Sequence, residues 1–145
     1  MTNTVTVTQQ QDYQFLVEFT PTIPTLVVDE PAPLGGGLGP SPGQLLLASV
    51  ANCLSASLHF ALQKFKQDAG GIHTSATDRI ERNSENRLRV EEITVVITLG
   101  KPAQDIEHLD RILSQFEAFC TVSQSVGRGI PIVVTVEDSA GVRVK

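Results

Sequence analysis

Cys53 and Cys120 are the residues of this chain best suited to covalent chemistry, and they are its only cysteines. They lie too far apart in the sequence to bind a metal ion together within one short loop. They can meet only if the fold brings two helical segments together. The chemistry then expected is that of a reactive thiolate with a resolving partner thiol.

Cys53 lies in a long apolar segment with helical periodicity, which predicts a helix from Pro42 to Gln67. Ser41 suits the N-cap, Pro42 the first helical position, and Gln44 completes a capping box. Gly70 and Gly71 should end the segment. The apolar stripe is expected to contain Leu46, Val50, Cys53, Ser57, Ala61 and Phe65. On helical spacing alone, a small buried apolar residue is the better explanation of Cys53.

Cys120 follows a second apolar pattern, which predicts an amphipathic helix through Ile106, Leu109, Ile112, Phe116 and Phe119. The segment 120–126 resembles the first turns of a further helix. Cys120 would then stand close to a helix start, where the local electrostatics favour a thiolate.

The remaining segments predict strands. Alternating β-branched and aromatic residues indicate strands around Val5–Val7, Tyr13–Phe19 and Leu26–Val28, followed by a shaped loop from Pro31 to Pro40. Two further strands, His73–Arg82 and Leu88–Leu99, flank a turn at 83–86, and Ile130–Val136 is the last strand. Strands and helices segregate along the chain, which predicts an α+β fold.

Composition limits the possible functions. The chain has 145 residues, of which 41% are hydrophobic, and this suits a single domain covering 1–145. A formal charge of −5 argues against a nucleic-acid partner. We expect no membrane span and no signal peptide, and therefore a cytoplasmic protein in which thiols stay reduced.

The segment from Gly39 to Leu54, the later Phe119-Cys-Thr-Val-Ser-Gln-Ser and the valine-rich last strand together resemble the OsmC/Ohr family of osmotically induced and organic-hydroperoxide-resistance proteins. The resemblance implies an intertwined homodimer, with antiparallel sheets wrapped around long central helices and a cofactor-free thiol peroxidase site at the interface. Cys53 matches the peroxidatic cysteine and Cys120 the resolving cysteine. An external dithiol would reduce the disulfide that they form.

The sequence departs from the family pattern in its charges. Family members pair the reactive cysteine with an Arg from the N-terminal strand region and hold that Arg with a Glu near the helix start. Here every Lys and Arg lies at or after Lys64, and the helix-start positions are Gly43 and Gln44. Arg128 is the candidate replacement, or else an exposed loop cation. The expected substrate pocket contains Gln44, Ser49, Asn52 and Arg128.

Two functions from different classes therefore remain open. One is a thiol-dependent peroxidase that reduces organic hydroperoxides or hydrogen peroxide through Cys53 and Cys120. The other is a catalytically degenerate dimer that binds an apolar small molecule at its interface. The isolated His59, His73 and His108 give no metal-ligand spacing, so no metal is expected. The glycine-rich loop lacks the Lys-Ser/Thr continuation of a phosphate loop.

Overall fold

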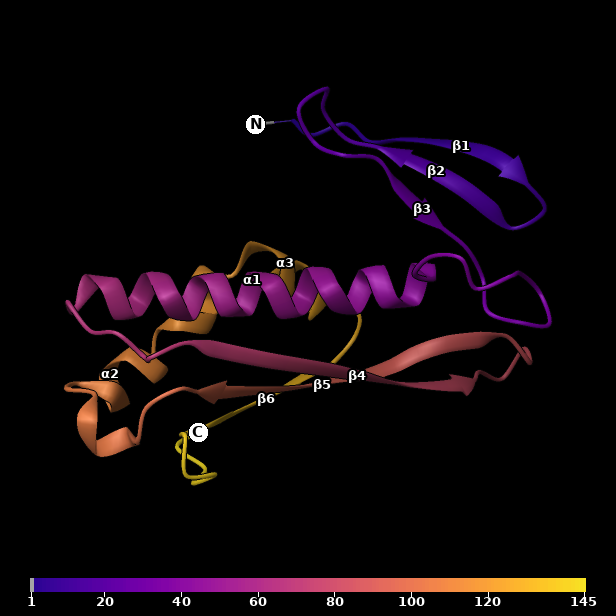
Figure 1. Ribbon diagram of the computed structural model, residues 1–145. Helices are drawn as coiled ribbons and strands as arrows, with labels where there is room; N and C mark the ends of the chain where they lie inside the picture. Colours follow the sequence, from indigo (N-terminus) through magenta and orange to yellow (C-terminus); the bar gives the residue numbers. More distant parts are fainter. Residues whose placement is uncertain (1) are drawn as a thin grey trace. The chain divides into compact units, whose positions relative to one another are not determined.

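The computed structural model describes residues 2–145, which divide into two compact units, residues 2–46 and Leu47–Lys145. The first unit is a three-stranded antiparallel sheet in the order β1-β2-β3 (Figure 1). Its strands are β1 (Thr6–Gln11), β2 (Gln14–Glu18) and β3 (Leu26–Val28). All three agree with the alternating segments of the sequence, although β1 begins and ends later than expected.

A buried carboxylate organises the glycine-rich loop that follows β3. Asp29 is only 4% exposed, and its side chain accepts hydrogen bonds from the backbone N–H groups of Glu30, Gly36 and Leu38. Charge-assisted bonds of this kind fix a loop that has no regular backbone pairing of its own. Gly39 permits a close backbone approach, because a Cβ there would lie 2.0 Å from the Val27 carbonyl oxygen.

The long helix α1 (Pro42–Lys64) begins within the last residues of the first unit, and most of it belongs to the second. The predicted capping box is confirmed. The Ser41 N–H donates to Gln44 Oε1 at 2.9 Å, and the Gln44 N–H donates to Ser41 Oγ at 3.3 Å. The helix ends three residues before the expected Gln67, because Lys66 adopts a left-handed conformation with φ of 55°.

In the second unit α1 lies along one face of a sheet in the order β4-β5-β6 (Figure 1). The strands are β4 (Ile72–Arg82), β5 (Leu88–Leu99) and β6 (Ile132–Glu137). Strands β4 and β5 are antiparallel, whereas β6 runs parallel to β5, because the helical segments between them carry the chain back before β6 begins. A hydrogen bond of 2.7 Å between the Ser55 and Thr74 hydroxyls joins α1 to β4.

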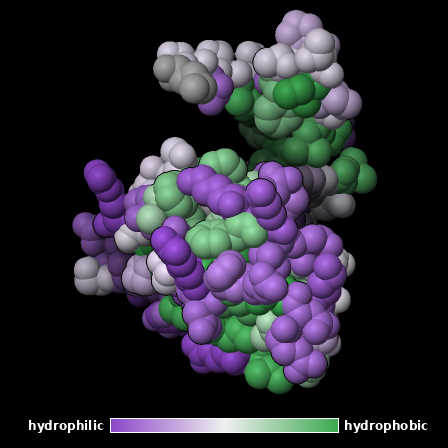
Figure 2. Space-filling model, turned by 90° about the vertical axis from the view of Figure 1, so that its left-hand side faces the viewer, coloured by the Kyte–Doolittle hydropathy of each residue, from purple (hydrophilic) through white to green (hydrophobic). Residues whose placement is uncertain are grey.

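The core of the second unit fills the space between α1 and this sheet. The contributing side chains are all at most 1% exposed, and they come from one stripe of α1 and alternate positions of β5: Val50, Leu54, Leu58, Leu62, Ile93, Val95, Ile97 and Leu99. Burying each such side chain contributes about 1.5–3 kcal/mol before conformational entropy is counted. Because these apolar side chains lie inside, the surface of the second unit in Figure 2 is mostly hydrophilic.

The helix expected between Ile106 and Phe119 is broken, and this prediction was wrong in its continuity. The segment forms η1 (Ala103–Asp105), α2 (Leu109–Leu113) and η2 (Phe116–Phe119), followed by α3 (Thr121–Val126). His108 has φ of 59° and interrupts the helical path. Ile106, Leu109, Ile112 and Phe116 are buried as the pattern predicted, because the shorter elements keep their spacing on one side.

Phe119 corrects another expectation, because it lies outside the core. It is 51% exposed, and its ring packs edge-on against Phe60 of α1 with a centroid distance of 6.2 Å. The Lys64 ammonium lies 4.6 Å from the Phe119 ring centroid and 4.7 Å from that of Phe60. This cation–π arrangement adds a second link between α1 and the segment that leads to Cys120.

By length and composition alone α1 could cross a membrane. The helix has no charged residue before Lys64. A helix that forms the core of a globular unit has the same composition, and α1 buries one stripe against the sheet. A single such helix is therefore weak support for a membrane span.

The close approach at Gly39 gives a direct test of the loop. Gly39→Ala should destabilise the protein by about 2 kcal/mol or more in denaturant unfolding, because the new Cβ would overlap the Val27 carbonyl. Gly36→Ala is the matched control in the same loop. Its Cβ would make an ordinary contact at 3.4 Å from Asp29 Oδ2. Equal stability of the two variants would show that the loop tolerates a different path.

Candidate thiol site

The two cysteines occupy different environments in the second unit. Cys53, on α1, is half-buried, whereas Cys120 is fully buried at 0% exposure. Cys120 is the N-cap of α3, and its Sγ accepts a hydrogen bond from the Ser123 N–H at 3.4 Å. The expectation that Cys120 stands where a helix begins is therefore confirmed. Cys53 is the more accessible of the two sulfur atoms.

The fold brings the two thiols together. The Val122 N–H, in the first turn of α3, donates to Cys53 Sγ at 3.5 Å, and the Cys53 and Cys120 side chains lie near each other. This contact joins the middle of α1 to the start of α3, as the sequence required for a thiol pair. A second thiol nearby is what a sulfenic acid needs in order to condense to a disulfide.

Burial dominates the electrostatics of Cys53. Desolvation raises the pKa of its thiol above the ordinary value of 9.0, and the neighbouring Cys120 side chain raises it further. The backbone N–H groups of Val122 and Ser123 act in the opposite direction and lower the pKa. The net direction is upward, so Cys53 is predominantly a neutral thiol at pH 7.

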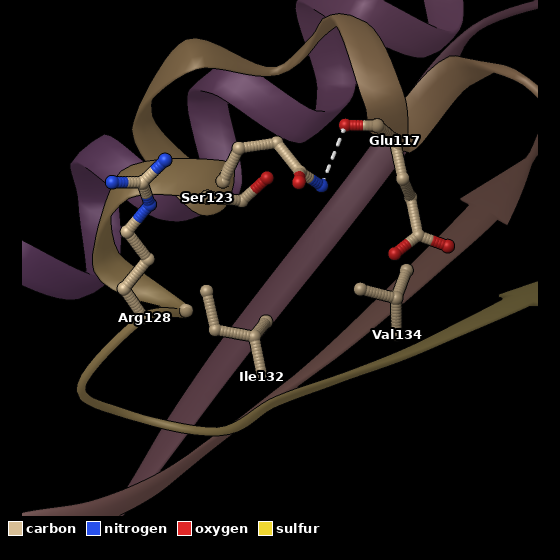
Figure 3. Close-up of a pocket in the computed structure, with 7 residues that line it drawn as sticks. Glu117, Ser123, Arg128, Ile132 and Val134 are labelled. Atoms are coloured by element: carbon tan, nitrogen blue, oxygen red, sulfur yellow. Dashed lines mark hydrogen bonds between the residues drawn. The ribbon is translucent and has the colours of Figure 1, made fainter.

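Within one chain, Arg128 is not among the groups that shift the pKa of Cys53. The groups that shift the Cys53 pKa are Cys120 and backbone amides, and no cationic side chain within residues 2–145 is among them. Arg128 is exposed and borders a separate cavity of about 400 Å³ between α3 and β6, which neither cysteine lines (Figure 3). As a replacement for the family's Arg, Arg128 stays a prediction that this geometry does not favour.

The other predicted pocket residues lie apart from the thiol pair or have different contacts. The Gln44 side chain closes the capping box with Ser41. Asn52 is exposed and lines a cavity of about 350 Å³ together with His59 and Asp68. Ser49 is exposed on α1. Sequence reasoning placed Asn52 there because it precedes Cys53 directly, but adjacent helical positions point in different directions.

Sequence reasoning missed the backbone donors of α3. The spacing of Cys120 and Ser123 matches an N-cap and its N3 position, so the bond to Cys120 could have been found from that pattern. The bond from Val122 to Cys53 depends on how α3 docks against α1 and has no sequence signal. Within the described part of the chain, no group of three or more His, Cys, Asp or Glu side chains could hold a metal ion.

The class of protein is defined by an α+β unit in which a half-buried and a fully buried thiol lie near each other, one on a long core helix and one at the start of a short later helix. A family model described as OsmC-like protein matches residues 35–135, and the chain belongs to this family. No curated protein matches the sequence.

Solved structures with the same fold cover nearly the whole chain. A putative osmotic stress induced and detoxification response protein from Psychrobacter arcticus is 23% identical, with a TM-score of 0.77 over 94% of this chain and 96% of that one. An organic hydroperoxide resistance protein from Elizabethkingia anophelis is 17% identical, with a TM-score of 0.75 over 96% and 99%. An OsmC-like protein of unknown function from Vibrio cholerae is 14% identical, with a TM-score of 0.79 over 94% and 99%.

The raised pKa of Cys53 predicts how its alkylation depends on pH. Iodoacetamide labelling of Cys53, followed by peptide mass spectrometry, should be slow at pH 7 and show an inflection above 9.0, since the thiolate is the reactive form. Arg128→Gln should leave the inflection unchanged. An inflection well below the ordinary value in the wild type, lost in Arg128→Gln, would contradict this and assign the cation role to Arg128.

Proposed function

We propose that the protein is a thiol-dependent hydroperoxide reductase that uses Cys53 and Cys120. The observation that carries the proposal is the contact between a half-buried and a fully buried thiol in a chain of the OsmC-like family. Relatives of the same fold include proteins named for organic hydroperoxide resistance. Cys53 is assigned the first step because it is the more accessible sulfur.

The reaction follows from the two thiols. The Cys53 thiolate attacks one oxygen of the hydroperoxide, the O–O bond breaks, and the leaving alkoxide takes the proton that the thiol gave up. Cys53 becomes a sulfenic acid and the hydroperoxide becomes an alcohol. The Cys120 thiol then condenses with the sulfenic acid, forming a disulfide and releasing water. An external dithiol reduces the disulfide by thiol–disulfide exchange and is itself oxidised.

The local contacts support a slow but specific first step. The amides of Val122 and Ser123 are fixed donors that stabilise the thiolate as it forms, while desolvation opposes ionisation. No cofactor takes part in this proposal. We place the reaction in the cytoplasm, where a dithiol reductant keeps the pair reduced between turnovers.

The raised Cys53 pKa also favours the second candidate, a catalytically degenerate member that binds an apolar small molecule at a dimer interface. A thiol that has no neighbouring cation to lower its pKa reacts slowly with peroxide. A binding role would need no reactive sulfur. The two functions differ in what happens to a hydroperoxide, so a turnover assay separates them.

Cumene hydroperoxide consumption with dithiothreitol as reductant tests the leading proposal. We expect catalytic turnover by the wild type that is lost in Cys53→Ser. In a single-turnover reaction without dithiothreitol, Cys120→Ser should still consume about one equivalent of peroxide, because Cys53 can form a sulfenic acid, but it should form no disulfide within the chain. A wild type that leaves the hydroperoxide unconsumed would contradict the reductase and favour the binding protein.

We also propose that the protein is a homodimer. Among residues 2–46, only two apolar side chains are buried, Val17 and Val28, which is little for an independently stable sheet. Its exposed apolar side chains would gain from a partner surface: Val5, Val7, Tyr13, Phe19, Ile23, Leu34 and Leu38.

Light scattering coupled to size exclusion tests the assembly. The expected mass is about twice the 15.6 kDa of the chain, because an obligate partner would cover the apolar surface of the first unit. A concentration series extends the measurement to weak association. A mass equal to one chain throughout the series would contradict the dimer.

A further inference from the structure

The cavity between α3 and β6 contains an orphaned polar group. Ser123 is 7% exposed, and its hydroxyl oxygen is buried without a hydrogen-bond partner among the described residues. Figure 3 places this hydroxyl inside the ring of side chains that line the cavity. Buried hydroxyls without a partner are rare in folded proteins, and an absent ligand is one physical reason for one.

The cavity is lined by one positively charged side chain that forms no ion pair with residues 2–145. Glu117, on one side, forms an ion pair with Lys145 and is therefore neutralised. Arg128, on another side, is exposed and has no ion pair among residues 2–145. Its guanidinium offers the planar pair of N–H donors that matches a carboxylate. A dianion such as phosphate suits the cavity less well, because a single unpaired cation faces it and the Glu117 carboxylate lies nearby.

The cavity also has an apolar side. Ile132 and Val134 are alternate residues of β6 and lie on the same side of the strand, across the cavity from Ser123 (Figure 3). The volume of about 400 Å³ is within the range of small-molecule sites. A short hydrocarbon chain can rest on these two side chains while its charged end meets Arg128.

We propose that this cavity binds a small monocarboxylate with a short apolar tail. Arg128 pairs with the carboxylate, the Ser123 hydroxyl donates to one of its oxygens, and the tail packs on Ile132 and Val134. The site is separate from the thiol pair, since neither cysteine lines it. It therefore stands whether or not Cys53 and Cys120 reduce hydroperoxides. The Ser123 backbone N–H, which donates to Cys120 Sγ, connects the two sites through one residue.

Titration with sodium hexanoate, followed by amide chemical shifts in two-dimensional NMR, tests the site. We expect saturable shifts at Ser123, Gln124, Gly127 and Ile132. Hexanol, the neutral probe of similar size, should bind at least about tenfold more weakly, because it cannot pair with the guanidinium. Saturable shifts of equal strength with hexanol, or none with hexanoate, would overturn the proposal.

Three variants sharpen the test. Arg128→Gln should weaken hexanoate binding about tenfold, whereas Arg87→Gln, the same charge change in the exposed β4–β5 turn, should leave it unchanged. Ser123→Ala should weaken binding without lowering the thermal unfolding temperature, because the hydroxyl has no partner to lose in the free protein. If the two Arg variants weakened binding equally, general electrostatic attraction would explain the binding, and the proposed site would be wrong.

Discussion

The hydrogen bond from the Val122 N–H to Cys53 Sγ fixes the start of α3 against the middle of α1, and the thiol site depends on this contact. It forms because α1 is held rigidly by its buried stripe on the sheet, while β5 and β6 determine where the connecting segment begins and ends. The edge-on packing of Phe60 and Phe119 supports the same docking two turns further along α1. Shifting α3 by one turn would separate the sulfur atoms and remove the donors of Val122 and Ser123.

Burial without a nearby cation is the second constraint on the site. It raises the pKa of Cys53, so the thiolate is a minor species at neutral pH. The barrier to reaction with peroxide therefore includes the free energy needed to ionise the thiol. The amide donors of α3 offset part of this cost, and they do so without the long side chain of an arginine. A thiol of this kind resists adventitious oxidation, since reactivity follows thiolate content.

The sequence predicted the elements well because the strongest local signals act over short distances. The capping box at Ser41 and Gln44, the turn after Arg82 and the helix start at Cys120 all involve residues within four positions of one another. The features that sequence reasoning missed depend on tertiary contacts or on single backbone angles. His108 and Lys66 adopt left-handed conformations that break helical patterns, and the role of Asp29 appears only when the loop closes around it. Arg128 could be named from the sequence, but its separation from Cys53 follows from the docking of α3.

The central claim is that Cys53 and Cys120 of one chain form a redox pair. Non-reducing peptide mapping after treatment with one equivalent of organic hydroperoxide tests it most directly. The account predicts a disulfide between the peptides that contain Cys53 and Cys120, formed within a single chain and reversed by a dithiol. Thiols that remain free after this treatment, or a link between the Cys53 residues of two chains, would contradict it.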